Sequence, residues 1–112
     1  MISIFKEDQK NLLVTLDLHE ASLTNAEVFK LELLQLFETH HKHIILNMDQ
    51  VEYIDSSFVG ALVALLRQLM TVKKDLILVG LRKEIADLFA LIRLDKVFKI
   101  YSSFDEAGSS LN

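Results

Sequence analysis

The sequence predicts an α/β domain in which helices pack against a mixed β-sheet of four to five strands. Three observations lead to this fold class. The chain opens with two short apolar runs, its later segments alternate between helical and strand-like patterns, and the strand-like runs in the middle are apolar throughout. Continuously apolar strands are typical of a parallel sheet covered on both faces, whereas two opening strands with a short polar connection favour a hairpin.

The chain is expected to form one domain over residues 1–112. It contains no proline, only three glycines, no internal repeat and no low-complexity stretch that would mark a linker. A chain of this length can bury enough apolar surface to fold without disulfides or metal ions.

Three strands are expected in the first half of the chain. Residues 1–5 and 12–18 are apolar runs separated by the polar stretch 6–11, which is the pattern of a hairpin. Residues 43–48 form a further, continuously apolar run. Its composition predicts a buried strand of the parallel part of the sheet.

A helix is expected between these strands, from residue 24 to about residue 40. The segment Thr24-Asn25-Ala26-Glu27 has the spacing of a capping box, which makes Thr24 the expected N-cap. Apolar side chains recur behind it at helical spacing and predict one buried stripe. The stripe consists of Phe29, Leu33, Leu36 and Phe37.

The longest apolar segment predicts a central helix over about residues 56–72. It is apolar on all sides, so a single buried face does not account for it. Gly60 lies inside this helix and is expected to permit close packing against another backbone. Four leucines are expected to fill the core: Leu62, Leu65, Leu66 and Leu69.

The remainder of the chain continues the alternation of strand and helix. Residues 76–80 predict a buried strand, residues 83–92 an amphipathic helix, and residues 97–101 a last strand. Ser103 and Glu106 have capping-box spacing and predict a final short helix. Parallel strands joined through these helices should have right-handed crossovers.

Composition excludes several classes of function. Twelve Lys and Arg residues stand against sixteen Asp and Glu residues, a net charge of −4, and no basic stripe of the kind that binds nucleic acid is present. The absence of cysteine excludes disulfides, thiolate metal sites and cysteine nucleophiles. The longest charge-free apolar run, residues 56–66, is too short to span a bilayer, and no targeting signal is visible. A cytoplasmic protein without membrane insertion is therefore expected.

No metal site, cofactor or catalytic centre is predicted. The four histidines, His19, His40, His41 and His43, are not spaced to converge as a ligand set. Ser56 has no histidine close in sequence that would act as its base, which argues against a hydrolase. The sequence also lacks a glycine-rich phosphate loop, so the protein is not expected to be an enzyme.

The polar segment Asp55-Ser56-Ser57 stands between a strand and the central helix. Short oxygen-bearing side chains cap helices, so one interpretation is structural. The alternative is that Ser56 is phosphorylated, because free N–H groups at a helix start tolerate a phosphate. Phe58 and Val59 are expected near the rim as apolar anchors for a partner, unless both fold under neighbouring loops.

The segment from Tyr53 to Gly60, Tyr-Ile-Asp-Ser-Ser-Phe-Val-Gly, resembles the signature of the STAS family of anti-sigma factor antagonists, usually written Asp-Ser-Ser/Thr-Gly-Leu-Gly. The resemblance continues through residues 43–53, 76–89 and 94–101. It departs from the family pattern at Phe58 and Val59, which replace glycine and leucine. Ser22 also stands where the family carries an acidic residue of its partner-binding surface.

The resemblance implies a single STAS domain acting as a phosphorylation-controlled interaction module in bacterial transcription. Its partner would be an anti-sigma factor of the serine-kinase type, with a serine phosphatase as a further partner. Unphosphorylated, the domain would bind the anti-sigma factor and release a sigma factor; the kinase would modify Ser56 and end binding. Asp55, Ser57, Phe58, Val59 and Ser22 are the expected contact residues. The alternatives are a constitutive STAS subunit of a stressosome-like or lipid-transport assembly, and a phosphocarrier or enzyme of comparable fold.

Overall fold

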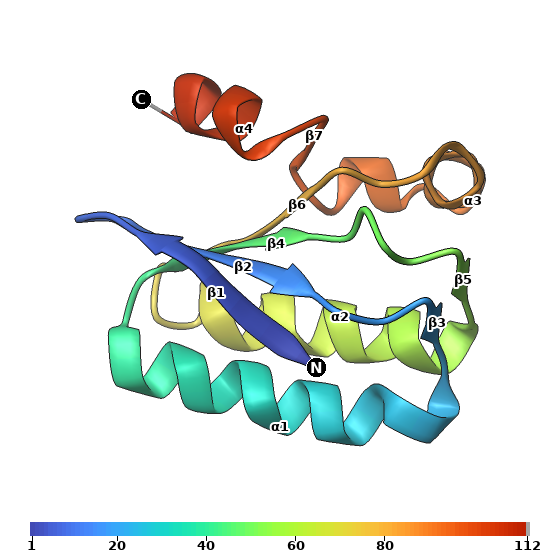
Figure 1. The fold of residues 1–112 in the computed structure, drawn as a ribbon, viewed down its shortest axis with the longest axis horizontal. Coiled ribbons are helices and arrows are strands. Elements are labelled where there is room, and N and C mark those ends of the chain that lie inside the picture. The colour runs from blue at the N-terminus through green and yellow to red at the C-terminus, as the bar shows by residue number, and fades with distance from the viewer. Residues whose placement is uncertain (112) are drawn as a thin grey trace.

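The computed structural model describes residues 1–111 and contains a five-stranded mixed sheet with helices on both faces (Figure 1). The strands are β1 (Ile2–Glu7), β2 (Asn11–Leu16), β3 (Glu20–Ala21), β4 (His43–Asn47), β5 (Tyr53–Ile54), β6 (Leu76–Val79) and β7 (Ile100–Tyr101). The helices are α1 (Leu23–His40), α2 (Ser56–Met70), α3 (Lys83–Leu91) and α4 (Phe104–Leu111), with a short 3₁₀ turn, η1 (Leu94–Lys96), before β7.

The main sheet has the strand order β1-β2-β4-β6-β7. β1 runs antiparallel to β2, and the other neighbouring pairs are parallel. This arrangement confirms the predicted α/β class, the mixed sheet and the opening hairpin. Parallel neighbours need a crossover, and α1, α2 and α3 supply the crossovers between β2, β4, β6 and β7.

The sheet separates a large core from a small one. Along β2, Leu12 and Val14 contact the core shared with α1 and α2, whereas Leu13 points to the face covered by α4. This alternation follows from the two-residue period of a strand. Figure 1 shows α1 and α2 below the sheet and α4 above it.

The central helix α2 confirms the predicted leucine core. Leu62, Leu65 and Leu69 are fully buried, and Leu66 is 3% exposed. In α1 the predicted stripe is buried at Phe29 and Leu33 and half-buried over its last turn, at Leu36 and Phe37. The expectation for Gly60 was wrong: it is exposed, and a Cβ at this position would meet nothing within 4 Å.

The first helix starts two residues before the predicted position. Its N-cap is Ser22, whose backbone is extended at φ −137° and ψ 178°. The Ser22 hydroxyl accepts the Thr24 N–H at 3.3 Å, and the Asn25 side-chain oxygen accepts the Ser22 N–H at 2.9 Å. The predicted cap at Thr24 was wrong because Asn25 closes the reciprocal pair at Ser22, in the place of the glutamate sought in the pattern.

Two further differences concern short elements. β3 and β5 are a parallel pair of two residues each, too short to leave a periodic signal in the sequence. The last strand begins at Ile100 instead of residue 97, because Val97 closes η1 by donating its N–H to Leu94. At α4 the predicted cap is confirmed, since the Ser103 hydroxyl accepts the Glu106 N–H at 3.1 Å.

None of the helices described between residues 1 and 111 combines the length and the apolarity needed to cross a membrane.

Leu62→Ala should lower the free energy of unfolding by about 2–5 kcal/mol, because it leaves a cavity beneath α2 where a fully buried side chain stood. Met70→Ala is the matched control on the same helix. Met70 is 60% exposed, so its truncation should change stability by no more than about 0.5 kcal/mol. Urea titrations of both variants check this, and equal losses would contradict the assignment of the buried face.

Ser22→Ala should destabilise the protein by about 1 kcal/mol through loss of the N-cap of α1. Thr24→Ala, two residues further on, removes an exposed side chain inside the first turn and should change stability by less than about 0.5 kcal/mol. Thermal unfolding of the two variants side by side distinguishes the caps. A larger loss for Thr24→Ala would place the start of the helix at residue 24.

Candidate functional site

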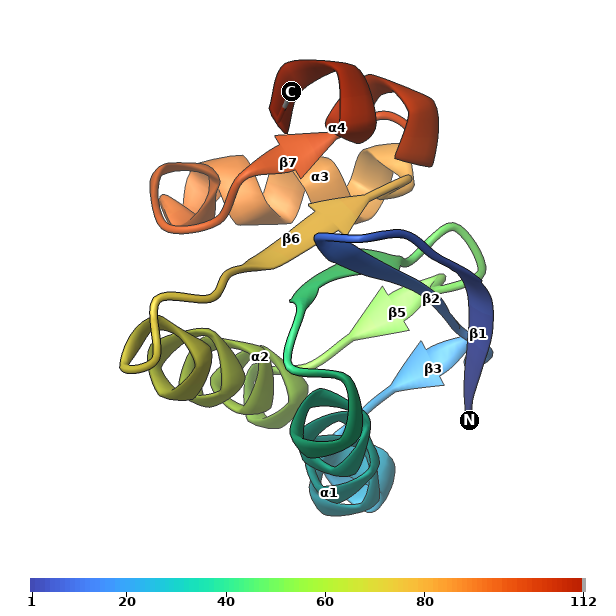
Figure 2. The same cartoon turned by 90° about the vertical axis from the view of Figure 1, so that its left-hand side faces the viewer.

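The starts of α1 and α2 lie side by side because β3 and β5 pair in front of them. The His19 carbonyl accepts the N–H groups of Glu52 and Tyr53 at 2.8 and 3.2 Å, and the Ala21 carbonyl accepts the Asp55 N–H at 3.0 Å. Both strands therefore end in register, one leading into Ser22 and the other into Asp55. Figure 2 shows the two short strands next to each other.

Asp55 connects the two helix starts through its carboxylate. One oxygen, Oδ1, accepts the Phe58 N–H of α2 at 3.0 Å and caps that helix. The other, Oδ2, accepts the Leu23 N–H of α1 at 2.9 Å. A single side chain thus satisfies an unpaired donor of each helix.

These bonds keep Asp55 ionised. The Phe58 N–H and then the Leu23 N–H lower the pKa of the Asp55 carboxyl from its ordinary value, against a smaller opposing effect of burial. Hydrogen bonds to the charged form favour that form. Because each carboxylate oxygen accepts a backbone donor, Asp55 acts as a cap shared by the two helix starts.

Ser56 is exposed at the first residue of α2, and Ser57 beside it is half-buried. Since Asp55 makes the cap, the start of α2 does not depend on the Ser56 hydroxyl. The arrangement offers an accessible hydroxyl to solvent at a helix end that carries free N–H donors and partial positive charge.

Phe58 does not lie at the rim, so the expectation that it is an exposed partner anchor was wrong. Its side chain is fully buried, and its ring packs against Phe29 of α1 with centroids 4.6 Å apart. At the third position of α2 it faces the neighbouring helix instead of solvent. Val59 is half-buried and packs against the same core.

Two exposed apolar side chains near Ser56 were missed in the sequence. Leu23, whose backbone bonds to Asp55, is 72% exposed, and Tyr53, two residues before Asp55, is 54% exposed. Tyr53 faces outward because its strand neighbour Ile54 faces the core, an alternation that two residues are too few to show in the sequence. No signal in the sequence marks Leu23 either, since its exposure follows from its place at the first turn of α1.

Three of the four histidines have separate polar partners. His19 lies 3.4 Å from the Glu52 carboxylate, His40 lies 2.9 Å from Glu7, and His43 accepts the Asp75 N–H. Across residues 1–111, no three His, Cys, Asp or Glu side chains come together as a possible metal-ligand set.

Comparison with known proteins agrees with this geometry. The model of the STAS domain family matches residues 6–107. The crystal structure of a Thermotoga maritima protein proposed to be an anti-sigma factor antagonist is similar to this chain, with 28% sequence identity over 88% of this chain and 86% of its own and a TM-score of 0.77.

Two more distant structures share the fold. An anti-sigma-factor antagonist (STAS) domain protein of Planctomyces limnophilus is 18% identical over 95% of this chain and 93% of its own, with a TM-score of 0.81. The phosphorylated form of the Bacillus cell fate determinant SpoIIAA is 18% identical over 100% of both chains, with a TM-score of 0.73. Because the family model matches residues 6–107 of the 112-residue chain, the protein belongs to the STAS domain family.

Proposed function

We propose that this domain is an anti-sigma factor antagonist of the bacterial cytoplasm whose binding to an anti-sigma serine kinase is controlled by phosphorylation of Ser56. The observation that carries the proposal is the exposed Ser56 directly after Asp55, at a helix start that Asp55 alone caps. The role is that of an interaction module and involves no catalysis by this chain. A serine phosphatase would restore the binding form.

The position of Ser56 separates modification from folding. A phosphate there meets the free N–H groups and partial positive charge of the first turn of α2, so the fold tolerates it. The hydrogen bonds of Asp55 to Phe58 and Leu23 do not involve the modified oxygen. The modification therefore acts on the surface offered to a partner.

The expected change at that surface is electrostatic. Phosphorylation adds about −1.5 to −2 charges beside the ionised Asp55 carboxylate. A partner that docks through complementary charge and apolar contact meets a concentrated negative charge at the centre of its footprint. Like-charge repulsion at an interface can lower affinity by several kcal/mol, and every ~1.4 kcal/mol is a factor of ten.

The partner surface proposed around Ser56 has an apolar part and a polar part. Leu23 and Tyr53 are the exposed apolar side chains and replace Phe58 in the anchoring role. Val59 and Ser57 border the phosphorylation site. Ser22 contributes chiefly by capping α1 and so by holding Leu23 in place.

Two structural neighbours support the proposed role as an anti-sigma factor antagonist. The Thermotoga maritima protein, at 28% identity, is itself proposed to be an anti-sigma factor antagonist. SpoIIAA, described as an anti-sigma factor antagonist, has structures in unphosphorylated and phosphorylated forms.

Ser56 should be the residue modified when the partner kinase and ATP are supplied. Ser56→Ala should keep the fold, resist modification and bind the kinase constitutively, and Ser57→Ala is the matched control that should still be phosphorylated. Phosphorylated protein should bind at least about tenfold more weakly than unmodified protein. Mass spectrometry locates the phosphate, and calorimetry measures the affinities.

Ser56→Asp should weaken binding less than phosphate does, because a carboxylate carries less charge. Phosphate found on Ser57, or equal partner affinity before and after modification of Ser56, would contradict the switch. Equal affinity would favour the constitutive subunit of a larger assembly.

Asp55→Asn should lower the midpoint of thermal unfolding at neutral pH. The amide oxygen can still accept the Phe58 N–H, but an NH₂ group in place of Oδ2 cannot accept the Leu23 N–H. The pKa of Asp55 is lowered in the folded state, so its carboxylate stabilises the fold above the unfolded pKa of about 3.9. That stability is lost as the pH falls through the lower folded pKa.

The variant should therefore lose less stability than the parent between neutral and strongly acidic pH. The control is Glu27→Gln, which removes an exposed carboxylate of α1 whose ion-pair partner is Lys30. This variant should lose as much stability at acidic pH as the parent protein does. Parallel pH profiles for Asp55→Asn and the parent would show that Asp55 does not join the helices in solution.

A further inference from the structure

A basic hollow lies at the end of the parallel sheet opposite Ser56. Two depressions of about 200 and 450 Å³ meet where His43, Asp75 and Lys99 line both. They lie where β4 and β6 begin, beyond the last turn of α2. Since α2 has 15 residues, Ser56 is about 20 Å away along the helix.

The hollow concentrates positive charge in a chain whose net charge is −4. Lys10, Lys73, Lys74 and Lys99 line it from three different connections. Among the lining residues that the structure describes, the one carboxylate is that of Asp75, which lies 3.2 Å from the Lys99 ammonium. Within the part of the chain that the structure describes, the other three lysines have no carboxylate at ion-pair distance.

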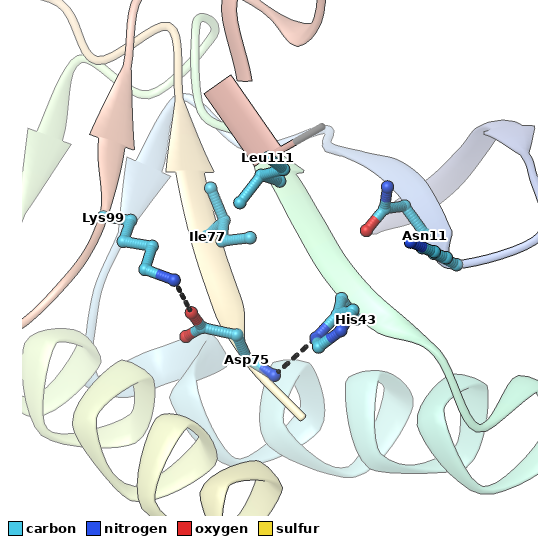
Figure 3. A pocket seen from close by; sticks show the side chains of 7 residues that line it. Asn11, His43, Asp75, Ile77, Lys99 and Leu111 are labelled. Carbon is cyan, nitrogen blue, oxygen red and sulfur yellow. Dashed lines mark hydrogen bonds and ion pairs between the residues drawn. The ribbon is translucent and has the colours of Figure 1, made fainter. Parts of the chain in front are cut away.

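His43 adds a fixed hydrogen-bond donor. Its Nδ1 accepts the Asp75 N–H at 3.1 Å, so the neutral ring carries its proton on Nε2 (Figure 3). Burial lowers the pKa of His43, and the nearby Lys74, Lys99 and Lys10 lower it further, against the opposing effect of Asp75. The imidazole thus experiences the positive field of the hollow.

Lys73 occupies a backbone position that favours glycine. Its φ is +62°, and the Lys73 and Lys74 N–H groups bond back to the carbonyls of Met70 and Leu69. This is the Schellman ending of a helix, in which the left-handed residue is usually glycine. A lysine is held in a strained conformation here, which adds a charge at the edge of the hollow at the expense of local stability.

The floor of the larger depression is apolar. Leu66 is nearly buried, whereas Met70 and Val97 are more than half exposed beside the lysines. The cationic side chains are lysines and no arginine is among the lining residues. Lysine binds phosphate as a point charge, and a phosphate monoester carries about −1.5 to −2 charges at neutral pH, more than the single charge of a carboxylate.

We propose that this hollow is a binding site for a small organic phosphate monoester, with the phosphate among Lys73, Lys74, Lys99 and His43 and an apolar body on Met70 and Val97. The site is separate from Ser56 and does not depend on the switch proposed there.

A titration with phenyl phosphate tests the proposal, and NMR signals of the backbone amides and of the His43 ring monitor binding. Saturable changes should centre on residues 73–75, His43 and Lys99. Bound phosphate should raise the pKa of His43, since it offsets the neighbouring lysine charges. Inorganic phosphate should bind more weakly because it lacks the apolar body, and benzoate should bind more weakly because its carboxylate carries a single negative charge against about −1.5 to −2 for the phosphate monoester. Phenol should not bind.

Lys73→Gly is the most informative variant, because it relieves the left-handed backbone while removing a charge. It should raise the melting temperature and weaken phenyl phosphate about fivefold, so the loss cannot come from unfolding. His41→Gly relieves a second left-handed residue, φ +52°, outside the hollow and should raise the melting temperature without weakening binding. Lys83→Gln removes one lysine charge elsewhere and should leave the affinity unchanged.

If Lys83→Gln and Lys73→Gly weakened phenyl phosphate binding equally, the ligand would be attracted by overall charge alone, and the proposed site would be overturned. An absence of saturable change at His43, or equal affinity for phenyl phosphate and benzoate, would also overturn it. Neither result bears on Ser56, whose test is independent.

Discussion

The carboxylate of Asp55 is the interaction on which the rest of the site depends. It bonds to backbone donors of two helices, and one of those donors, on Leu23, is 32 residues away in sequence. The short β3–β5 pair brings the segments together, and the contact between Phe29 and Phe58 fills the space beneath them. The relative position of the two helix starts, and with it the surroundings of Ser56, is therefore fixed by backbone bonds and ring packing.

The order of helices and strands could be predicted from sequence because the segments are long and their periodicity is clear. The leucines of α2 contact the same core as Ile44 and Leu46 of β4, and each segment was recognisable from its own pattern. What failed depended on tertiary partners. A two-residue strand such as β5 has no periodicity, and the cap at Ser22 depends on a hydrogen bond from Asn25 that the pattern for glutamate did not include.

The sequence predicted the helix start at Asp55 and Ser56, but it did not predict which apolar side chains around that start are exposed. Asp55 and Ser56 stand at a helix start that local chemistry identifies. The depth of Phe58 could not be predicted, because it depends on how α1 lies against α2, and the exposure of Leu23 depends on the same packing. The basic hollow brings together Lys10, Lys74 and Lys99, which are separated by 64 and 25 residues in the sequence, so only the folded chain reveals it.

Asp55 caps α2 and the Ser56 hydroxyl does not, so the two residues can change independently. Because Asp55 provides the cap, a single substitution at Ser56 removes the hydroxyl proposed as the phosphorylation site without weakening the start of α2. Under the proposed switch, loss or gain of the hydroxyl at residue 56 would therefore be nearly neutral for folding, whereas loss of the Asp55 carboxylate would remove a bond from each of the two helix starts.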